Sequence, residues 1–321
     1  MKSSDEILKI LRPELDALEQ RRLELNAKRA QGTGWMIAVL AVAFLVAVMG
    51  SRSGGIGSLF IGAIIAIIGW AIIWSLFFGK AAEEFKRLFK EKVVACAARE
   101  IAPGMSYQPS GFISKDWFVG SGLFTTRPDR YSGEDYFAGR VGQTELFFSE
   151  VHAQDKRTRT DSNGNTSTYY VTIFKGLFVV ADFHKDFRST VYVRPDKLES
   201  FGSFGRALQG LAGNVERMEN VEFERRFKVT ATDSVEARYL LTPAMQERFI
   251  ELAENYSTEL RAAFKGSLLY LAIPKTADWF EGQLGTPVDD QHQMKTICNE
   301  LRAAVHLVDA LDLNTRIWTK Q

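Results

Sequence analysis

Two apolar runs, GWMIAVLAVAFLVAVMG at residues 34–50 and IGSLFIGAIIAIIGWAIIWSLFFG at residues 56–79, decide the organisation of this chain. Neither run contains an acidic, basic or histidine residue, and a short turn containing Arg52 separates them. A helix rises about 1.5 Å per residue, so about 20 apolar residues cross a hydrocarbon layer roughly 30 Å thick. The sequence therefore predicts a transmembrane helical hairpin over residues 32–79.

Basic residues flank this hairpin unevenly. Nine lysines and arginines lie close to its two outer ends, whereas Arg52 alone lies in the turn. Because cytoplasmic ends of membrane helices carry an excess of Lys and Arg, both termini are expected in the cytoplasm. The first span follows about 30 mostly polar residues, which is not the form of a cleavable signal peptide. We therefore expect a multi-pass membrane protein, with the lipid bilayer as its surroundings.

The segments beside the hairpin predict amphipathic helices. Over residues 1–31, leucines at positions 8, 11, 15, 18 and 25 form a heptad seam that also contains Arg22. Residues 80–102 carry a matching apolar stripe. Since the two helices continue antiparallel spans, we expect them to leave the membrane side by side as a helical stalk, a short antiparallel coiled coil. Pro13 is expected to kink or interrupt the first helix.

The remaining part, residues 103–321, is nearly neutral and is expected to form a cytoplasmic domain. The whole chain carries a net charge of +1, and residues 80–321 hold 32 basic and 33 acidic side chains. Such a balance creates no field that attracts nucleic acid, so no nucleic-acid partner is expected. The two cysteines, Cys96 and Cys298, are too few for a disulfide framework and fit a reducing compartment.

Strands and helices alternate in clusters along this domain. Strands are expected at residues 129–139, 144–155, 169–182, 191–194 and 222–230, with Asn163-Gly164 marking a hairpin turn. A further hairpin is expected from residues 257–264 and 267–273. Within residues 113–124 we expect a short helix that Ser114 caps and that ends at Gly120 or Gly122, and further helices are expected at residues 233–239, 243–256 and from residue 289 or 290 to 311. Residues 197–219 show a helical pattern that four glycines weaken, so they are expected to form a helix or a loop with two short helices. This pattern favours an α+β fold with a mainly antiparallel sheet.

Several stretches are similar in amino-acid sequence to a known family. They are YSGEDYFAGRVG (residues 131–142), ELFFSEV (145–151), FKGLFVVADFHKDF (174–187) and VEFERRFKVTATDSVEARYLLTPAMQERFIEL (221–252). The sequence of these stretches and their position after two spans resemble the DUF3137 family, bacterial membrane proteins of unknown function. The resemblance covers nearly all of residues 34–275. The resemblance implies no activity, cofactor or site residue. It implies a bacterial inner (plasma) membrane as the location, and a LemA-type membrane protein as a partner.

Glu150 and His152 are the candidate catalytic residues. They are two apart on an expected strand and would share one face, where a carboxylate and an imidazole could act as an acid–base pair. The alternative is a cross-strand charge pair or plain polar surface, which we favour. The nearby acidic pair Glu134-Asp135 is interpreted as capping a turn.

Asp182, His184 and Asp186 are the candidate metal ligands. Continued strand alternation would place all three on one face, and carboxylates with histidine can bind zinc or iron. The alternative, which we favour, is the solvated face of a sheet. If the strand ends at Asp182, the alternation is broken. The cations of the polar hairpin, Lys156, Arg157 and Arg159, would contact anionic lipid or, as we favour, solvent.

The sequence lacks the common catalytic motifs, namely a Walker loop, GxGxxG, GxSxG, HExxH and CxxC. The leading hypothesis is therefore an interaction or scaffold module held at the membrane, with no cofactor and no enzymatic activity. The alternative hypothesis is a membrane-tethered, possibly metal-dependent hydrolase that uses acidic and histidine residues of the sheet. Small residues in the spans leave open whether the hairpin packs on itself or forms a homo-oligomer.

Overall fold

The computed structural model describes residues 4–52, 57–183, 186–196, 214–257 and 259–311. The chain is an α+β protein with long N-terminal helices and a nine-stranded antiparallel sheet. It divides into two compact units. Unit 1 comprises Met1–Glu100 and Phe280–Cys298, and unit 2 comprises Ile101–Trp279 and Asn299–Gln321.

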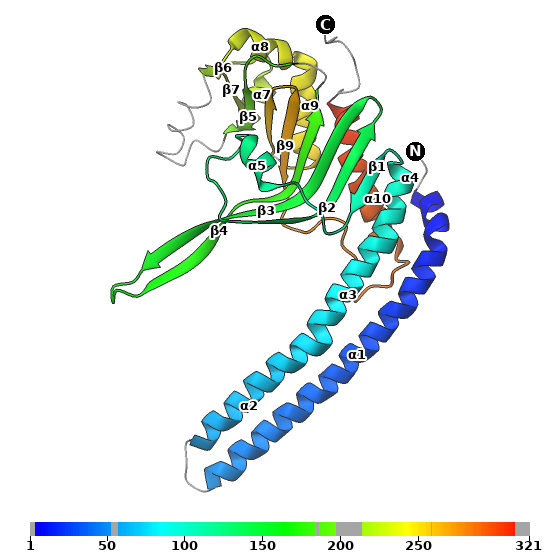
Figure 1. Cartoon of the computed structure of the whole chain (residues 1–321), viewed down its shortest axis with the longest axis vertical. Coiled ribbons are helices and arrows are strands. Elements are labelled where there is room, and N and C mark those ends of the chain that lie inside the picture. Colours follow the sequence, from blue (N-terminus) through cyan, green and yellow to red (C-terminus); the bar gives the residue numbers. More distant parts are fainter. Residues whose placement is uncertain (1–3, 53–56, 184–185, 197–213, 258, 312–321) are drawn as a thin grey trace. The chain divides into compact units, whose positions relative to one another are not determined.

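Unit 1 is dominated by two long helical arms (Figure 1). The first arm is α1 (Ser4–Arg52). The second consists of α2 (Gly57–Ile73), the π-helical turn η1 (Trp74–Gly79), α3 (Lys80–Phe89), the π-helical turn η2 (Lys90–Val94) and α4 (Ala95–Ile101). Each arm contains an apolar stretch long enough to cross a membrane, and only 11% of each stretch is buried. Helices that are apolar on all sides yet exposed are typical of lipid surroundings rather than of a protein core.

The predicted interruption at Pro13 does not occur. Proline removes one backbone hydrogen bond, but α1 continues through it. Pro13 is exposed, so water can solvate the carbonyl group that loses its partner. Leu11 and Leu15, on either side of it, are both buried. Packing of the apolar seam therefore outweighs the local cost of the proline.

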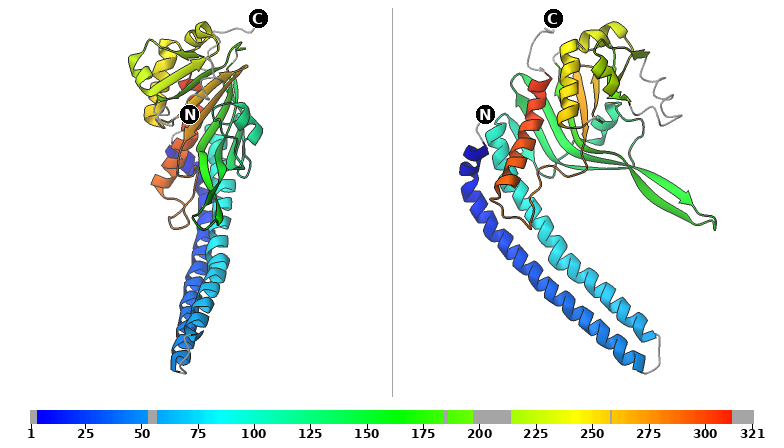
Figure 2. Two further views of the ribbon diagram at one scale, coloured as in Figure 1. Left: turned by 90° about the vertical axis from the view of Figure 1, so that its left-hand side faces the viewer. Right: turned by 180° about the vertical axis from the view of Figure 1, so that it is seen from behind.

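The polar halves of the two arms pack side by side, as expected (Figure 2). Buried side chains from α1 face buried side chains from the second arm; they are Ile7, Leu11, Leu15, Leu18 and Leu25 on α1, and Phe85, Phe89 and Val93 opposite. Ion pairs join the arms at their edges, where Arg21 lies 2.6 Å from Glu84 and Lys92 lies 3.3 Å from Glu14.

A second segment of unit 1, just before the last helix, binds to these arms. The backbone carbonyl of Leu284 accepts hydrogen bonds from Arg22 (3.1 Å) and Asn26 (3.0 Å) of α1. The buried Lys90 forms an ion pair of 3.0 Å with Glu281. Residues 280–298 are therefore held to the helices by polar contacts that amphipathic periodicity does not reveal.

Unit 2 is built on the sheet. Its strands, in spatial order, are β1 (Met105–Gln108), β2 (Arg130–Val141), β3 (Thr144–Thr160), β4 (Thr166–Asp182), β9 (Leu268–Pro274), β8 (Arg261–Lys265), β5 (Val191–Pro195), β7 (Phe227–Ala231) and β6 (Asn214–Glu216). The hairpin at Asn163-Gly164 and the hairpin between β8 and β9 are confirmed. The turn residue Gly266 has a φ of +66°, which glycine adopts without steric cost.

Both faces of the sheet are covered. On one face, Phe118 of α5 (Lys115–Gly120) packs with Phe174 and Phe178 of β4. On the other face, Phe249 of α9 (Pro243–Asn255) packs against Phe264 of β8. Leucines from the C-terminal half of α10 (Gln291–Ala310) and just beyond it approach this second face next to β3, β4 and β9.

One predicted strand is partly wrong. Residues 222–230 were expected to be extended, but α7 (Val221–Arg226) forms first and only Phe227–Ala231 is strand β7. The side chain of Asn220 accepts hydrogen bonds from the backbone N–H groups of Glu222 (2.9 Å) and Phe223 (3.2 Å), which caps the helix. The short helix predicted after Ser114 is confirmed, since α5 begins at Lys115 and ends at Gly120, one of its two expected ends, although the Ser114 side chain makes no capping hydrogen bond. The caps Asp233 of α8 (Ser234–Leu240) and Thr242 of α9 are confirmed as well.

The β3–β4 hairpin extends beyond the rest of the sheet (Figure 1). Pairing of β2 with β3 ends at Arg130 and Gln154, and pairing of β4 with β9 ends at Gly176 and Pro274. Residues 155–160 and 166–171 therefore pair only with each other within the described part of the chain. We call residues 155–171 the hairpin ribbon.

Candidate functional site

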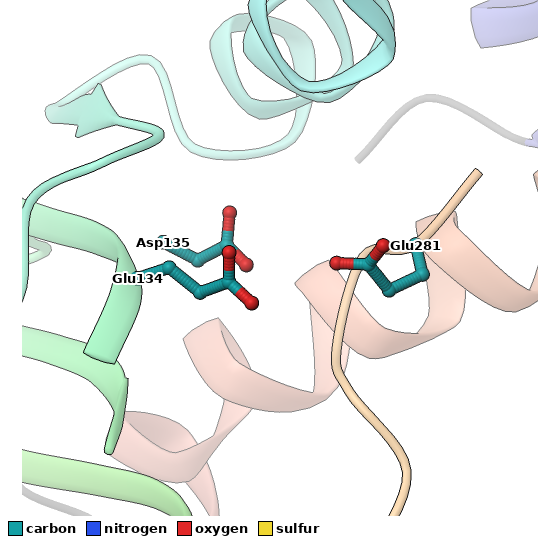
Figure 3. Close-up of side chains that lie close together, drawn as sticks. All are labelled: Glu134, Asp135 and Glu281. Atoms are coloured by element: carbon teal, nitrogen blue, oxygen red, sulfur yellow. The ribbon is translucent and has the colours of Figure 1, made fainter. Parts of the chain in front are cut away.

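A bulge in β2 places two carboxylates beside β3. The register between β2 and β3 shifts between Glu134 and Phe137, and Asp135 has a φ of 59°. The Asp135 N–H donates to the Pro109 carbonyl (2.9 Å), and its carboxylate accepts from the Tyr107 hydroxyl (2.6 Å). Figure 3 shows the Glu134 and Asp135 side chains next to each other, with carboxylate oxygens within 4.8 Å. The acidic pair thus lies in a β-bulge, where the left-handed backbone needs such support.

Glu150 of β3 lies directly opposite Glu134 and is only 4% exposed. Its Oε2 accepts a hydrogen bond of 2.9 Å from the backbone N–H of Trp279. Burial, together with the charges of Asp278 and Glu134, raises the pKa of Glu150 to about 7, although the Trp279 hydrogen bond opposes this shift. Glu150 therefore changes protonation near neutral pH, where a general acid or base operates.

Lys175 of β4 interacts electrostatically with Asp278, Glu150 and Glu134. Its Nζ lies 2.6 Å from Oδ1 of Asp278, and the hydrogen bond to this carboxylate raises the pKa of Lys175. Lys175 therefore stays charged at neutral pH.

His152, the predicted partner of Glu150, makes a different contact. Its Nε2 lies 3.2 Å from the Thr172 hydroxyl, and burial together with the charge of Lys175 lowers its pKa. Glu150 bonds to the Trp279 backbone instead. The structure thus places both candidates on β3 but gives them separate hydrogen-bond partners, and their acid–base role stays a prediction.

Two of the predicted metal ligands, Asp182 and Asp186, lie at the end of β4 and in the segment that follows it. The strand ends at Asp182, and Asp186 is exposed in the loop that follows. His184 lies outside the described residues. Phe183 and Phe187 are buried against Phe264, so the aromatic side chains of this loop point inward as expected. The metal assignment stays a prediction, because β4 itself carries only the first of the three ligands.

A cleft of about 480 Å³ opens on the face of the sheet that α5 covers. Its walls include Phe124, Phe174 and Ala272, which are apolar, and its rim carries Lys175 and Lys275. The guanidinium group of Arg261 also lines it and stacks on the Phe124 ring, with 4.6 Å between the Arg261 Cζ and the ring centre.

A second arginine lies behind Arg261. Val193 of β5 pairs with Ala262 of β8, so Arg194 and Arg261 are the next residues along these adjacent strands. Burial, and then the charge of Arg194, lower the pKa of Arg261 to about 10. Two largely buried cations side by side are unfavourable without a counter-charge. We call this feature the Arg194–Arg261 cleft.

Sequence reasoning missed both arginines, together with Asp278 and Lys175. Arg194 ends an otherwise apolar strand, VYVRP, and Lys175 interrupts another, IFKGLFVV. A charge inside an apolar strand is the signal that could have identified them, since such a residue needs a partner or a ligand.

Comparison with solved structures gave a crystal structure of the mycobacterial trehalose monomycolate transport factor A, TtfA. The match covers 68% of this chain and 96% of that chain, at 10% sequence identity and a TM-score of 0.35. A TM-score this low supports no argument about this chain. A comparison with curated protein sequences gave no match.

A family model described as a protein of unknown function (DUF3137) matches residues 172–313. The matched part begins within β4 and includes every described element from β5 to α10. It contains Lys175, Arg194, Arg261 and Asp278, whereas Glu150 precedes it. The match agrees with the resemblance in the sequence over residues 172–275, continues to residue 313, and does not include the two apolar runs.

Proposed function

We propose that this chain is a protein of the bacterial inner membrane, with both termini in the cytoplasm, whose sheet domain is an interaction or scaffold module. The apolar stretches of the two arms support the proposal of a membrane anchor, because their side chains are mostly exposed. The excess of Lys and Arg at the outer ends of the hairpin supports the orientation. The seam between the polar halves of the arms supports a coiled-coil stalk.

Orientation is tested with reporters fused to the C-terminus. Green fluorescent protein should fluoresce there and alkaline phosphatase should stay inactive, and the full chain should remain in membranes washed with alkaline carbonate. Active phosphatase or extraction by carbonate would contradict the anchor.

The hairpin ribbon is the observation that carries the interaction role. Six residue pairs extend past the neighbouring strands, and nearly all of the ribbon is exposed. An isolated two-stranded hairpin is marginally stable in water, and its free edges are ready to pair with another strand. Its threonines, tyrosines and Val171 favour strand structure. We therefore propose that an extended segment of a protein partner pairs, as an added strand, with a free edge of the hairpin ribbon.

The partner proposed is a membrane protein of the LemA type, with a second copy of this chain as the alternative. Lys156, Arg157 and Arg159 are exposed on the ribbon, while Asp155 forms an ion pair of 3.0 Å with Arg157. This mixture of charges suits pairing with a polypeptide better than adsorption on anionic lipid, which favours a cluster of cations alone.

Photo-crosslinking in native membranes tests the ribbon. A crosslinker placed at Thr158 or Thr168, both exposed on paired positions, should yield a discrete protein adduct. A matched control at Glu247, exposed on α9, should yield none. A shortened variant joins Asp155 to Val171 through Asn-Gly, and it should lose the partner on purification while keeping its thermal midpoint. Equal recovery of all partners by the shortened and natural chains would refute the ribbon as the binding element.

A membrane-tethered hydrolase is the second candidate, and the buried Glu150 favours it because its pKa lies at about 7. Purified full-length protein would be assayed against ester and phosphate-ester substrates with its metal content measured. Hydrolysis that Glu150→Gln abolishes and Glu145→Gln leaves intact would support this function. Activity that is unchanged in Glu150→Gln would exclude Glu150 as the catalytic group.

A further inference from the structure

The Arg194–Arg261 cleft holds positive charge that the described residues do not neutralise. Lys175 and Lys275 at the rim are each paired with a carboxylate, Asp278 at 2.6 Å and Glu300 at 2.5 Å. Arg261 has no such partner within the described part of the chain, and its guanidinium group stacks on the Phe124 ring. The unneutralised charge of the cleft is therefore concentrated at the arginines.

Arg194 is fixed in place behind Arg261. It is 8% exposed, stacks on the Tyr192 ring, and donates to the Gly122 carbonyl (3.2 Å) and the Thr230 hydroxyl (3.4 Å). Its Nε is buried and has no hydrogen-bond acceptor among the described residues. Arg194 thus adds positive charge behind Arg261, and its two hydrogen bonds and the Tyr192 ring hold its guanidinium group there.

Glu259 is the acidic residue among those lining the cleft. Its charge acts on Arg261 less strongly than the charge of Arg194 does, and no ion pair joins the two side chains in the described structure. The threonine and serine hydroxyls at the rim supply neutral hydrogen-bond donors. The cleft therefore offers donors and cations to an incoming anion, with one acid to oppose it.

The size and walls of the cleft define the ligand further. A volume of about 480 Å³ lies within the range of small-molecule sites. Aromatic rings of Phe124 and Phe174 form one side, so an apolar body can lie against them while its charged group faces Arg261. A guanidinium fork binds two oxygens of one carboxylate or phosphate group at once.

We propose that the Arg194–Arg261 cleft binds a small organic anion, with its carboxylate or phosphate group on Arg261 and its apolar body against Phe124. The anionic group comes from a free metabolite or from a lipid headgroup, and both present the same chemistry. This inference is independent of the hairpin ribbon, which lies outside the cleft lining.

The test uses full-length protein in nanodiscs of neutral phosphatidylcholine and phenyl phosphate as the probe, measured by isothermal titration calorimetry. Phenyl phosphate should bind, and Arg261→Gln should weaken binding at least about tenfold, because a charge-assisted hydrogen-bonded pair is lost. Arg140→Gln, which changes an exposed arginine of β2, is the matched control and should bind like the natural chain. Phe124→Ala should weaken phenyl phosphate more than inorganic phosphate.

Two further measurements complete the design. The thermal midpoint of Arg261→Gln should not fall, because removing one of two neighbouring cations relieves repulsion, and Arg261→Lys should bind with intermediate affinity. In nanodiscs that contain anionic phosphatidylglycerol, competition with phenyl phosphate would identify a lipid headgroup as the source, and unchanged affinity would identify a soluble ligand. Absence of phenyl phosphate binding at millimolar concentration, or equal affinity in Arg261→Gln and the natural chain, would overturn the proposal.

Discussion

Replacing Glu150 with glutamine should change how stability depends on pH. Glutamine keeps the shape of the side chain, its oxygen still accepts from the Trp279 N–H, and its amide can donate to Asp278. It cannot ionise. Any effect that grows as pH rises therefore reports the charge of Glu150 rather than a lost contact.

The raised pKa of Glu150 determines whether stability rises or falls with pH. Below pH 4.5 the carboxyl group is protonated in both the folded and the unfolded chain, and between pH 4.5 and about 7 the folded chain retains a proton that the unfolded chain has lost. Stability from this group is thus complete below pH 4.5 and is lost as pH rises through 7. Each tenfold change in proton affinity is worth about 1.4 kcal/mol, so the loss is at most about 3 kcal/mol.

The assay is the thermal midpoint of the full-length protein in a neutral detergent at pH 5 and pH 8. The natural chain should lose stability over this interval relative to Glu150→Gln, by up to about 10 °C for a domain of this size. The control is Glu145→Gln on the same strand, whose exposed side chain pairs with Arg140 and should contribute less than about 1 kcal/mol. If Glu150→Gln and Glu145→Gln track the natural chain equally at both pH values, the buried-acid reasoning is refuted.

Three other substitutions test the packing by the same thermal measurement. Gly122→Ala should destabilise the segment before Phe124 by about 1–3 kcal/mol, because Gly122 has a φ of +68° and an added Cβ would collide with the Tyr192 hydroxyl; no change would contradict this. Glu281→Ala should cost about 3 kcal/mol, because it removes a carboxylate that lies 3.0 Å from the buried Lys90 ammonium group, and Lys90→Met combined with Glu281→Ala should recover part of the loss. Asn220→Ala should cost about 1 kcal/mol through loss of the α7 cap, a cost that Asn220→Asp should avoid.

Periodicity predicted the elements that depend on local chemistry. Asp233 and Thr242 start helices where expected, because an N-cap acts through backbone groups two or three residues away. The two apolar arms follow from length and hydropathy alone. Residues 221–226 show where this fails: Phe223 and Phe227 are both buried and fit a strand pattern or a helix pattern, and Asn220 decided between them.

The candidate sites were harder to predict because they depend on which segments meet. Glu150 could be placed on a strand from its sequence, but its burial depends on Trp279 and Asp278, more than 120 residues further along the chain. A one-dimensional pattern assigns a face to a residue without saying what covers that face. The same limit explains why the sequence favours an exposed polar position for Glu150, a prediction that is wrong because the carboxylate is buried.

The paired arginines show how this limit can be reduced. In VYVRP the side chains of Tyr192 and Arg194 share a face, and in RAAF the side chains of Arg261 and Ala263 share the face next to it. Once β5 and β8 are known to pair, register alone brings the two cations together, without any side-chain coordinates. A charge within an apolar strand should therefore be examined against every possible neighbouring strand, because two such charges on one buried face are costly unless something offsets them.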